Sequence, residues 1–237
     1  MDWTRYDAAL FDLDGVITPT AIVHMRAWSE MFNAYLTSRG IAEPYTDEDY
    51  FSYVDGKPRY DGVRTFLASR GITLPEGEPT DAPGTETVCG LGNGKNDAFR
   101  TVLERDGVEP YAGSVQLLDH LAAIGTKVAV VSSSQNARPV LTSAGLVDRF
   151  PVIVDGVVAR QDRLAGKPAP DTFLDAAERL GVPRERAVVL EDAESGVAAG
   201  RAGGFGLVVG VDRGAGVDRL TASGADVVVS DLAELVP

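Results

Sequence analysis

Short apolar runs recur along this chain of 237 residues, and most are followed by a segment with helical periodicity. Runs such as KVAVV, AVVL and GLVVGV are almost continuously apolar, so we expect strands that helices cover on both faces. Such strands form parallel sheets with right-handed helical crossovers. The pattern predicts an α/β fold with a doubly wound, Rossmann-like parallel sheet.

The alternation of strand and helix is interrupted once. It begins at residue 7, stops near residue 20 and resumes near residue 109. The stretch between contains two segments with helical periodicity, a loop rich in proline and glycine (LPEGEPTDAPGTE), and the helical segment KNDAFRTVLERDG. We predict a core domain of residues 1–19 and 109–237, with an all-α cap domain of residues 20–108 inserted after the first strand.

Composition and charge exclude several functions. Lysine and arginine number 22 against 35 acidic residues, a net charge of −13, which argues against the basic face that nucleic-acid binding would need. No apolar run reaches about 18 residues, so no membrane helix is expected, and the acidic N-terminus does not resemble a signal peptide. A single cysteine, Cys89, excludes an internal disulfide and favours a reducing compartment. We expect a cytoplasmic monomer without nucleic-acid or membrane partners.

Polar side chains follow three of the predicted strands, at the sheet edge where α/β proteins bind ligands. Asp12 and Asp14 follow the first of these strands, Ser132 follows the second, and Glu191 and Asp192 follow the third. Lys167 lies in the sequence between the second and the third of these strands. Carboxylates as close as Asp12 and Asp14 repel each other and are costly to bury, so a bound cation would explain the pair. With only two histidines in the chain, we expect a hard cation held by oxygen atoms, such as Mg²⁺.

These residue types indicate phosphoryl transfer. A carboxylate such as Asp12 can attack phosphorus and form an aspartyl phosphate. A second carboxyl, that of Asp14, can protonate the leaving oxygen and later deprotonate the incoming nucleophile. Lys167 and the hydroxyl of Ser132 can balance and orient the charged phosphoryl oxygens.

The order and spacing of these residues resemble the four motifs of the haloacid dehalogenase (HAD) superfamily. The motifs are DLDGVIT, Ser132, Lys167 and LEDAESG. The insert resembles the helical cap of that superfamily. The resemblance implies that Asp12 is the nucleophile and Asp14 the acid and base. It also implies that Mg²⁺ is held by Asp12, the backbone oxygen of Asp14, and Asp192, with Glu191 assisting.

Within the superfamily, the chain most resembles the β-phosphoglucomutase-like subfamily, which implies a small phosphorylated sugar as substrate. The resemblance assigns Thr20 to a hinge, and it implies a set of substrate-binding residues. These are His24, Gly56, Arg59, Lys95, Asn96, Ser134 and Asn136. Arg59 would bind the phosphate that is not being transferred. The chain departs from the subfamily pattern at Pro19, Gln135 and Ala193, around the sugar.

Several alternatives stay open at this point. A sugar hydroxyl could take the phosphoryl group from Asp12, as in a mutase, or water could take it, as in a phosphatase. A dehalogenase is disfavoured because it would need neither Asp14 nor the acidic pair. A phosphorylated receiver module is disfavoured by the inserted cap. His24 lies beside the apolar stripe of its helix, so it could also be a surface residue.

The glycine-rich segment CGLGNGKN is not expected to bind a nucleotide. A phosphate-binding loop of that type has a serine or threonine after its lysine, and an apolar strand before it. Lys95 is followed by Asn96, and no such strand precedes the segment.

Overall fold

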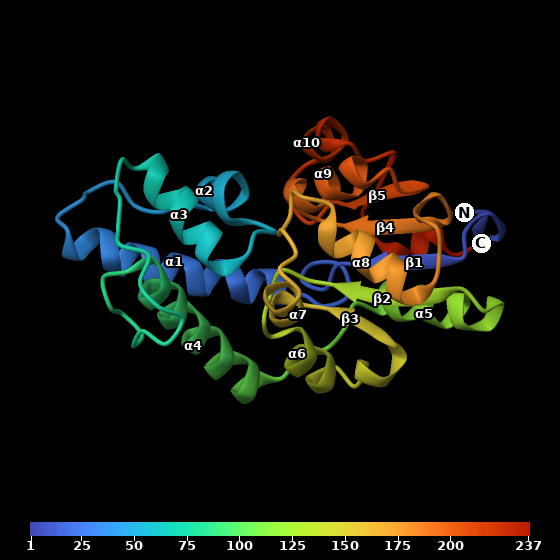
Figure 1. The fold of residues 1–237 in the computed structure, drawn as a ribbon, viewed down its shortest axis with the longest axis horizontal. Helices are drawn as coiled ribbons and strands as arrows, with labels where there is room; N and C mark the ends of the chain where they lie inside the picture. Colours follow the sequence, from blue (N-terminus) through green and yellow to red (C-terminus); the bar gives the residue numbers. More distant parts are fainter. The chain divides into compact units, whose positions relative to one another are not determined.

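The computed structural model describes residues 1–237, which divide into two compact units (Figure 1). The core unit comprises Met1–Pro19 and Val108–Pro237, and the cap unit comprises Thr20–Gly107. Both ends of the chain belong to the core unit, where the Met1 amino group donates to the Leu235 carbonyl oxygen at 3.4 Å.

The core unit contains a six-stranded, all-parallel sheet in the order β3-β2-β1-β4-β5-β6. The strands are β1 (Ala8–Phe11), β2 (Lys127–Val131), β3 (Val152–Val154), β4 (Ala187–Glu191), β5 (Leu207–Val211) and β6 (Val227–Val229). The chain starts in the middle of the sheet, extends it to one side through β2 and β3, and then extends it to the other. This doubly wound topology confirms the predicted fold class.

Helices connect the strands of the core unit. They are α5 (Ala112–Ile124), α6 (Ala137–Ser143), α7 (Gly156–Gln161), α8 (Asp171–Leu180), α9 (Glu194–Gly203) and α10 (Val217–Ser223). Short 3₁₀ segments are η1 (Trp3–Arg5), η3 (Val147–Arg149), η4 (Arg184–Arg186) and η5 (Leu232–Leu235). Ala8 and Leu10 of β1 pack in one cluster with Phe173 of α8, and all four residues of β1 are buried. A strand buried on both faces explains the unbroken apolar run AALF.

The cap unit is entirely helical. Its elements are α1 (Thr20–Ser38), α2 (Asp47–Asp49), a π-helical turn η2 (Tyr50–Val54), α3 (Arg59–Ser69) and α4 (Val88–Asp106). The predicted stripe on α1 faces the interior, where the Phe32 ring lies 5.2 Å from Trp28 and 4.2 Å from Phe66 between ring centroids. The all-α insert after the first strand is therefore present as predicted.

One helix boundary in the cap was predicted wrongly. Helix α4 begins at Val88, seven residues before the expected start at Lys95, so the glycine-rich segment is helical. A Cβ atom on Gly90 would lie 2.4 Å from the Thr85 carbonyl oxygen, and one on Gly92 would lie 2.9 Å from the Tyr60 ring. The glycines allow close packing against α4, and this packing overrides their low helix propensity.

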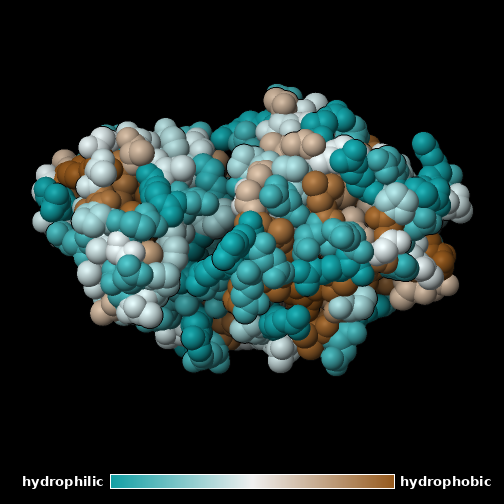
Figure 2. Space-filling model, viewed as in Figure 1, coloured by the Kyte–Doolittle hydropathy of each residue, from teal (hydrophilic) through white to brown (hydrophobic).

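The visible surface is mostly hydrophilic, with hydrophobic residues showing over the part of the core unit that contains β3 (Figure 2). A groove of about 660 Å³ runs beside this edge strand and is lined by apolar residues such as Leu118, Val128 and Val152. None of the helices combines the length and the hydropathy that a membrane span requires.

Candidate active site

Strand register brings the predicted polar side chains to one edge of the sheet. Phe11 of β1 lies in register with Val130 of β2 and with Leu190 of β4. Asp12 and Glu191 therefore lie at the same level, and the Asp12 amide donates to the Leu190 carbonyl oxygen at 2.9 Å. Parallel pairing alone thus collects groups that are far apart in the sequence.

Lys167 lies at the centre of this group. Its Nζ atom donates to Asp12 Oδ1 at 2.5 Å, Glu191 Oε1 at 2.6 Å and the Val131 carbonyl oxygen at 3.1 Å. The side chains of Lys167 and Glu191 are 1% and 0% exposed. Three acceptors match the three protons of an ammonium group, so Lys167 is a fully bonded buried cation rather than a solvated surface lysine.

The charges of this cluster are not balanced by Lys167 alone. Burial by itself would lower the pKa of Lys167, but the carboxylates of Asp12 and Glu191 raise it above its usual value. Burial raises the pKa of Asp12 well above its usual value, and Glu191 and Asp14 add to this effect while Lys167 opposes it. A bound cation would oppose this rise in the pKa of Asp12 and offset the excess of negative charge.

The acidic residues fit a hard metal ion. Carboxylate oxygens of Asp12, Glu191 and Asp192 lie within 4.8 Å of one another, and all three residues are buried. A Cβ atom on Gly15 would lie 1.8 Å from Asp192 Oδ2, and one on Gly196 would lie 1.7 Å from Glu191 Oε1. The two glycines leave space for these carboxylates, and the all-oxygen donor set is the type that Mg²⁺ prefers.

The turn that carries Asp14 is fixed from the other end of the chain. Gly15 has φ +87°, and its amide donates to the Thr18 carbonyl oxygen at 2.7 Å. Arg213 donates from Nε to the Gly15 carbonyl oxygen at 2.8 Å, and its guanidinium lies 3.9 Å from the centroid of the Tyr111 ring. The sequence analysis missed Arg213, because no motif marks the segment that follows β5.

Ser114 also holds this turn. Helix α5 begins at Ala112 with Tyr111 as the capping residue, so Ser114 lies inside its first turn. The Ser114 hydroxyl donates to the Val16 carbonyl oxygen at 2.6 Å and is fully buried. Its role is therefore to fix the Asp14 turn against α5.

In the segment after β2, the hydroxyls of Ser132 and Ser134 each accept a hydrogen bond from the backbone amide two residues further along. Ser132 Oγ accepts from the Ser134 amide at 3.1 Å, and Ser134 Oγ accepts from the Asn136 amide at 3.1 Å. Ser132 and Asn136 are buried. Because each serine oxygen accepts from the backbone, its own proton can be donated to an anion.

In the cap unit, His24 of α1 meets Lys95 of α4. Lys95 Nζ contacts His24 Nδ1, and the two residues are 5% and 9% exposed. The His24 ring stacks on Phe99 with centroids 4.0 Å apart, and Lys95 Nζ lies 4.9 Å from the centroid of the Trp28 ring. His24 is thus not a surface residue. An ammonium can only donate, so His24 Nδ1 is the acceptor of this contact when Lys95 carries its charge.

A second group in the cap unit surrounds Arg59, at the start of α3. Its Nη2 atom donates to Asn96 Oδ1 at 2.9 Å, and its Nη1 atom donates to Asn93 Oδ1 at 3.2 Å. Gly56 lies in the preceding turn with φ +68°, and Thr20 is the first residue of α1 and of the cap unit. Asn93 was not predicted. Its place one helical turn before Asn96 would have revealed it had the start of α4 been known.

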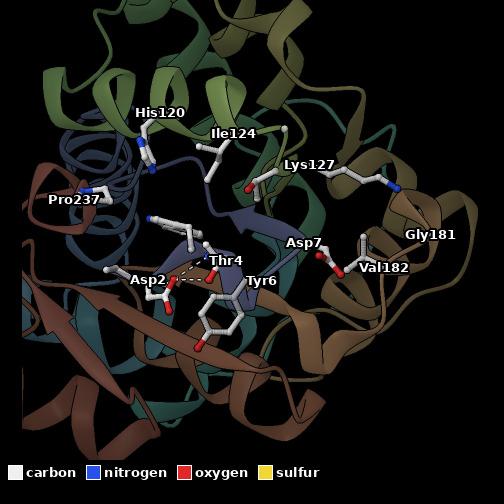
Figure 3. Close-up of a pocket in the computed structure, with 14 residues that line it drawn as sticks. Asp2, Thr4, Tyr6, Asp7, His120, Ile124, Lys127, Gly181, Val182 and Pro237 are labelled. Atoms are coloured by element: carbon white, nitrogen blue, oxygen red, sulfur yellow. Dashed lines mark hydrogen bonds between the residues drawn. The ribbon is translucent and has the colours of Figure 1, made fainter.

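A separate hollow lies at the opposite end of the sheet (Figure 3). It has a volume of about 680 Å³, and its lining includes Trp3, Tyr6, Asp7, His120 and Lys127. Asp7 directly precedes β1 and Lys127 begins β2, so the hollow lies at the amino ends of the strands. Because α/β proteins bind ligands beyond the carboxyl ends, we do not place the reaction here.

Comparison with known proteins identifies the class. A family described as haloacid dehalogenase-like hydrolase matches residues 6–204, and the chain belongs to this family. It is an enzyme of the HAD superfamily, a phosphomutase or a phosphohydrolase, and falls in the β-phosphoglucomutase-like subfamily.

Three of the similar proteins are named β-phosphoglucomutase. The chain is 54% identical over 239 residues to a protein of Mycobacterium bovis named β-phosphoglucomutase, covering 97% of this chain and 91% of the relative. A protein of Bacillus subtilis with the same name is 32% identical, with 96% and 91% covered. The crystal structure of β-phosphoglucomutase from Clostridium difficile is similar with a TM-score of 0.76 and 25% identity, covering 97% of this chain and 93% of that one.

Gly15→Ala is expected to displace the Asp192 carboxylate. The added methyl group would occupy the space of the Asp192 carboxylate, in addition to the backbone strain of roughly 1–2 kcal/mol at positive φ. The control is Gly125→Ala, because Gly125 has φ +75° and no atom within 4 Å of the added Cβ. Thermal unfolding with and without Mg²⁺ should show a smaller Mg²⁺-dependent rise in Tm for Gly15→Ala alone. Equal rises in both variants would contradict the role of Gly15 in placing Asp192.

Proposed function

We propose that this enzyme catalyses Mg²⁺-dependent phosphoryl transfer on a small sugar phosphate, converting β-glucose 1-phosphate to glucose 6-phosphate. The observation that carries the chemistry is the buried Asp12 carboxylate, which Lys167 binds at the carboxyl edge of the sheet. The choice of sugar rests on the 54% identity to a relative named β-phosphoglucomutase.

Asp12 would act as the nucleophile. As its carboxylate oxygen bonds to phosphorus, the bond from phosphorus to the sugar oxygen breaks, and Asp14 gives that oxygen a proton. In the second half of the reaction, Asp14 takes a proton from the free hydroxyl of an incoming β-glucose 1-phosphate, which keeps its own phosphate and so becomes the 1,6-bisphosphate, the donor of the first half. That oxygen then bonds to phosphorus as the bond to Asp12 breaks, which regenerates the free carboxylate.

The negative charge on the phosphoryl oxygens would be balanced by the ammonium group of Lys167 and stabilised by a hydrogen bond from the Ser132 hydroxyl. The residues that would hold Mg²⁺ are Asp12, Asp192 and the backbone oxygen of Asp14, with Glu191 assisting. When bound, Mg²⁺ supplies positive charge that reduces the repulsion between the phosphate and these carboxylates.

The cap unit would supply substrate recognition. Arg59 would bind the phosphate that is not being transferred, since a guanidinium binds phosphate through two parallel hydrogen bonds. His24, Gly56, Lys95 and Asn96, together with Ser134 and Asn136 of the core unit, would complete the substrate site. A hinge at Thr20 would let the cap exclude water, which favours a sugar hydroxyl as acceptor. The cytoplasmic location and the monomeric state stay predictions.

Phosphorus NMR tests this function directly. The enzyme is incubated with Mg²⁺, β-glucose 1-phosphate and a trace of the 1,6-bisphosphate, and we expect glucose 6-phosphate to accumulate. The α anomer of glucose 1-phosphate and a sample containing EDTA serve as controls and should give no product. Release of inorganic phosphate in place of glucose 6-phosphate would contradict the mutase and indicate a phosphatase.

A further inference from the structure

A polar network in the cap unit joins Arg59 to the loop of residues 75–87, for which the sequence analysis found no role. Asn93 lies at its centre. We propose that Asn93 is a positioning residue, which holds the Arg59 guanidinium in the orientation needed to bind a substrate phosphate, and that the 75–87 loop holds Asn93. The inference rests on the proposed function, in which Arg59 binds the phosphate that is not transferred.

The carboxamide of Asn93 uses its full bonding capacity. Oδ1 accepts from Arg59 Nη1 at 3.2 Å and from the Tyr60 hydroxyl at 3.0 Å. Nδ2 donates to the carbonyl oxygens of Pro79 at 3.1 Å and Asp81 at 3.0 Å. An arginine can only donate and a carbonyl can only accept, so the amide has one possible orientation. The side chain therefore links the loop rigidly to Arg59.

The loop itself is fixed at both ends. The Asp81 carboxylate accepts from the Thr87 hydroxyl at 2.6 Å and from the Glu78 amide at 3.2 Å. Thr87 in turn caps α4 by accepting from the Gly90 amide at 2.9 Å. At the start of the loop, the Pro75 carbonyl oxygen accepts from the Val88 amide at 3.0 Å. A loop anchored to the helix that carries Asn93 can keep that side chain in place.

The glycines of α4 make this arrangement possible. A Cβ atom on Gly92 would lie 3.1 Å from Arg59 Cδ as well as 2.9 Å from the Tyr60 ring, and one on Gly94 would lie 3.4 Å from the Gly84 amide of the loop. A Cβ atom at position 92 would push α3 away from α4, and one at position 90 would push away Thr85 of the loop, whereas at position 94 it would make ordinary contact with the loop. The glycine-rich segment is thus explained by the close approach of Arg59 and the loop to one helix face.

Two amide oxygens fix the plane of the guanidinium. Asn93 and Asn96 are three residues apart on α4, on one face of the helix, and they accept from Nη1 and Nη2 respectively. A bidentate contact with phosphate depends on this plane, because both hydrogen bonds must point at the same anion. A carboxamide orients the guanidinium without adding a negative charge that would compete with the phosphate.

A double-mutant cycle tests the proposal. Asn93→Ala should raise the KM for β-glucose 1-phosphate about tenfold and change kcat less than twofold, since binding rather than chemistry is affected. In an Arg59→Ala background, the same substitution should change kcat/KM less than twofold. A tenfold loss that persists without Arg59 would overturn the proposal, and so would a wild-type KM in Asn93→Ala. If the alanine variant does not fold, Asn93→Ser takes its place with the same expectations.

Asn33 provides a matched control. This asparagine of α1 also binds a loop of the cap, because its Oδ1 accepts from the Tyr45 amide at 2.8 Å and its Nδ2 donates to Ser29 Oγ at 3.2 Å. Asn33→Ala should lower Tm without changing KM. If it raises KM as much as Asn93→Ala does, the effect of Asn93 is on cap stability alone and the proposal fails.

A measurement on the free enzyme separates this proposal from the proposed function. Nitrogen-15 NMR of arginine side chains reports rotation of the guanidinium about its Nε–Cζ bond, and Arg59→Lys identifies the Arg59 signal. Rotation should be slow in the wild type and in Asn33→Ala, and at least tenfold faster in Asn93→Ala. Equal rates in all three would overturn the positioning role even if the enzyme is a mutase. If the enzyme shows no mutase activity, the proposed function is wrong, but the rotation rates still test the positioning role of Asn93.

Discussion

Asp12→Asn is expected to abolish turnover while leaving the enzyme folded. An amide nitrogen or oxygen is a poor nucleophile toward phosphorus, so the loss in kcat should be about 10⁴-fold or more. The fold should survive because Asn has nearly the same shape and keeps an oxygen that can accept from Lys167. The substitution also removes the buried Asp12 carboxyl group, whose pKa is raised by burial and by the charges of Glu191 and Asp14. Turnover and thermal unfolding, measured together, check both parts.

The control for this variant lies at the other end of the same strand. Asp7 directly precedes β1 and forms an exposed ion pair with Arg186. Asp7→Asn should therefore keep the wild-type turnover, with at most a small loss of stability. Mass spectrometry after reaction with the bisphosphate should detect an aspartyl phosphate on the wild type and on Asp7→Asn, but not on Asp12→Asn. Residual turnover of Asp12→Asn within tenfold of the wild type would contradict its assignment as nucleophile.

The residues that could be grouped from the sequence alone were grouped for one physical reason. In a parallel sheet, the ends of the strands meet at one edge, so residues that follow apolar runs can be grouped without knowing any other contact. Asp12 and Glu191 were found in this way, 179 positions apart in the sequence. Lys167 was found because it precedes a helix at the same edge and completes a known set of motifs.

The features that were missed depend on contacts between distant segments. Arg213 reaches Gly15 from 198 positions away, and Asn93 reaches Arg59 from 34 positions away. No local pattern marks either contact. The start of α4 was misplaced for a related reason, because glycine at positions 90, 92 and 94 disfavours a helix until the neighbours that pack against it are known. Each glycine does have a low helix propensity, but packing against neighbouring segments makes the whole stretch helical.

The second large effect is expected at Lys167, whose replacement should destabilise the fold. Lys167→Met leaves the carboxylates of Asp12 and Glu191, 8% and 0% exposed, without the ammonium that lies between them. Breaking a buried ion pair by removing one partner costs about 3–5 kcal/mol. We expect a loss of this size in the free energy of unfolding near neutral pH, measured by urea denaturation. Turnover should fall as well, since Lys167 is proposed to hold the phosphoryl group.

The pH dependence of this loss separates charge from packing. In the wild type, the pKa of Lys167 is raised above its usual value of 10.5, so its stabilising effect is complete below that pH. In Lys167→Met, Asp12 loses the cation that opposes the rise of its pKa in the folded state, so this pKa rises further above the unfolded value. The variant therefore loses stability relative to the wild type as the pH rises through the folded-state pKa of Asp12, and its deficit should grow between about pH 5 and pH 8. Lys127→Met is the matched control, since Lys127 is exposed and donates to the Leu180 carbonyl oxygen rather than to a carboxylate, and its smaller deficit should not vary with pH. A deficit of Lys167→Met that is equally flat would show that Lys167 stabilises the fold by packing and not by its charge.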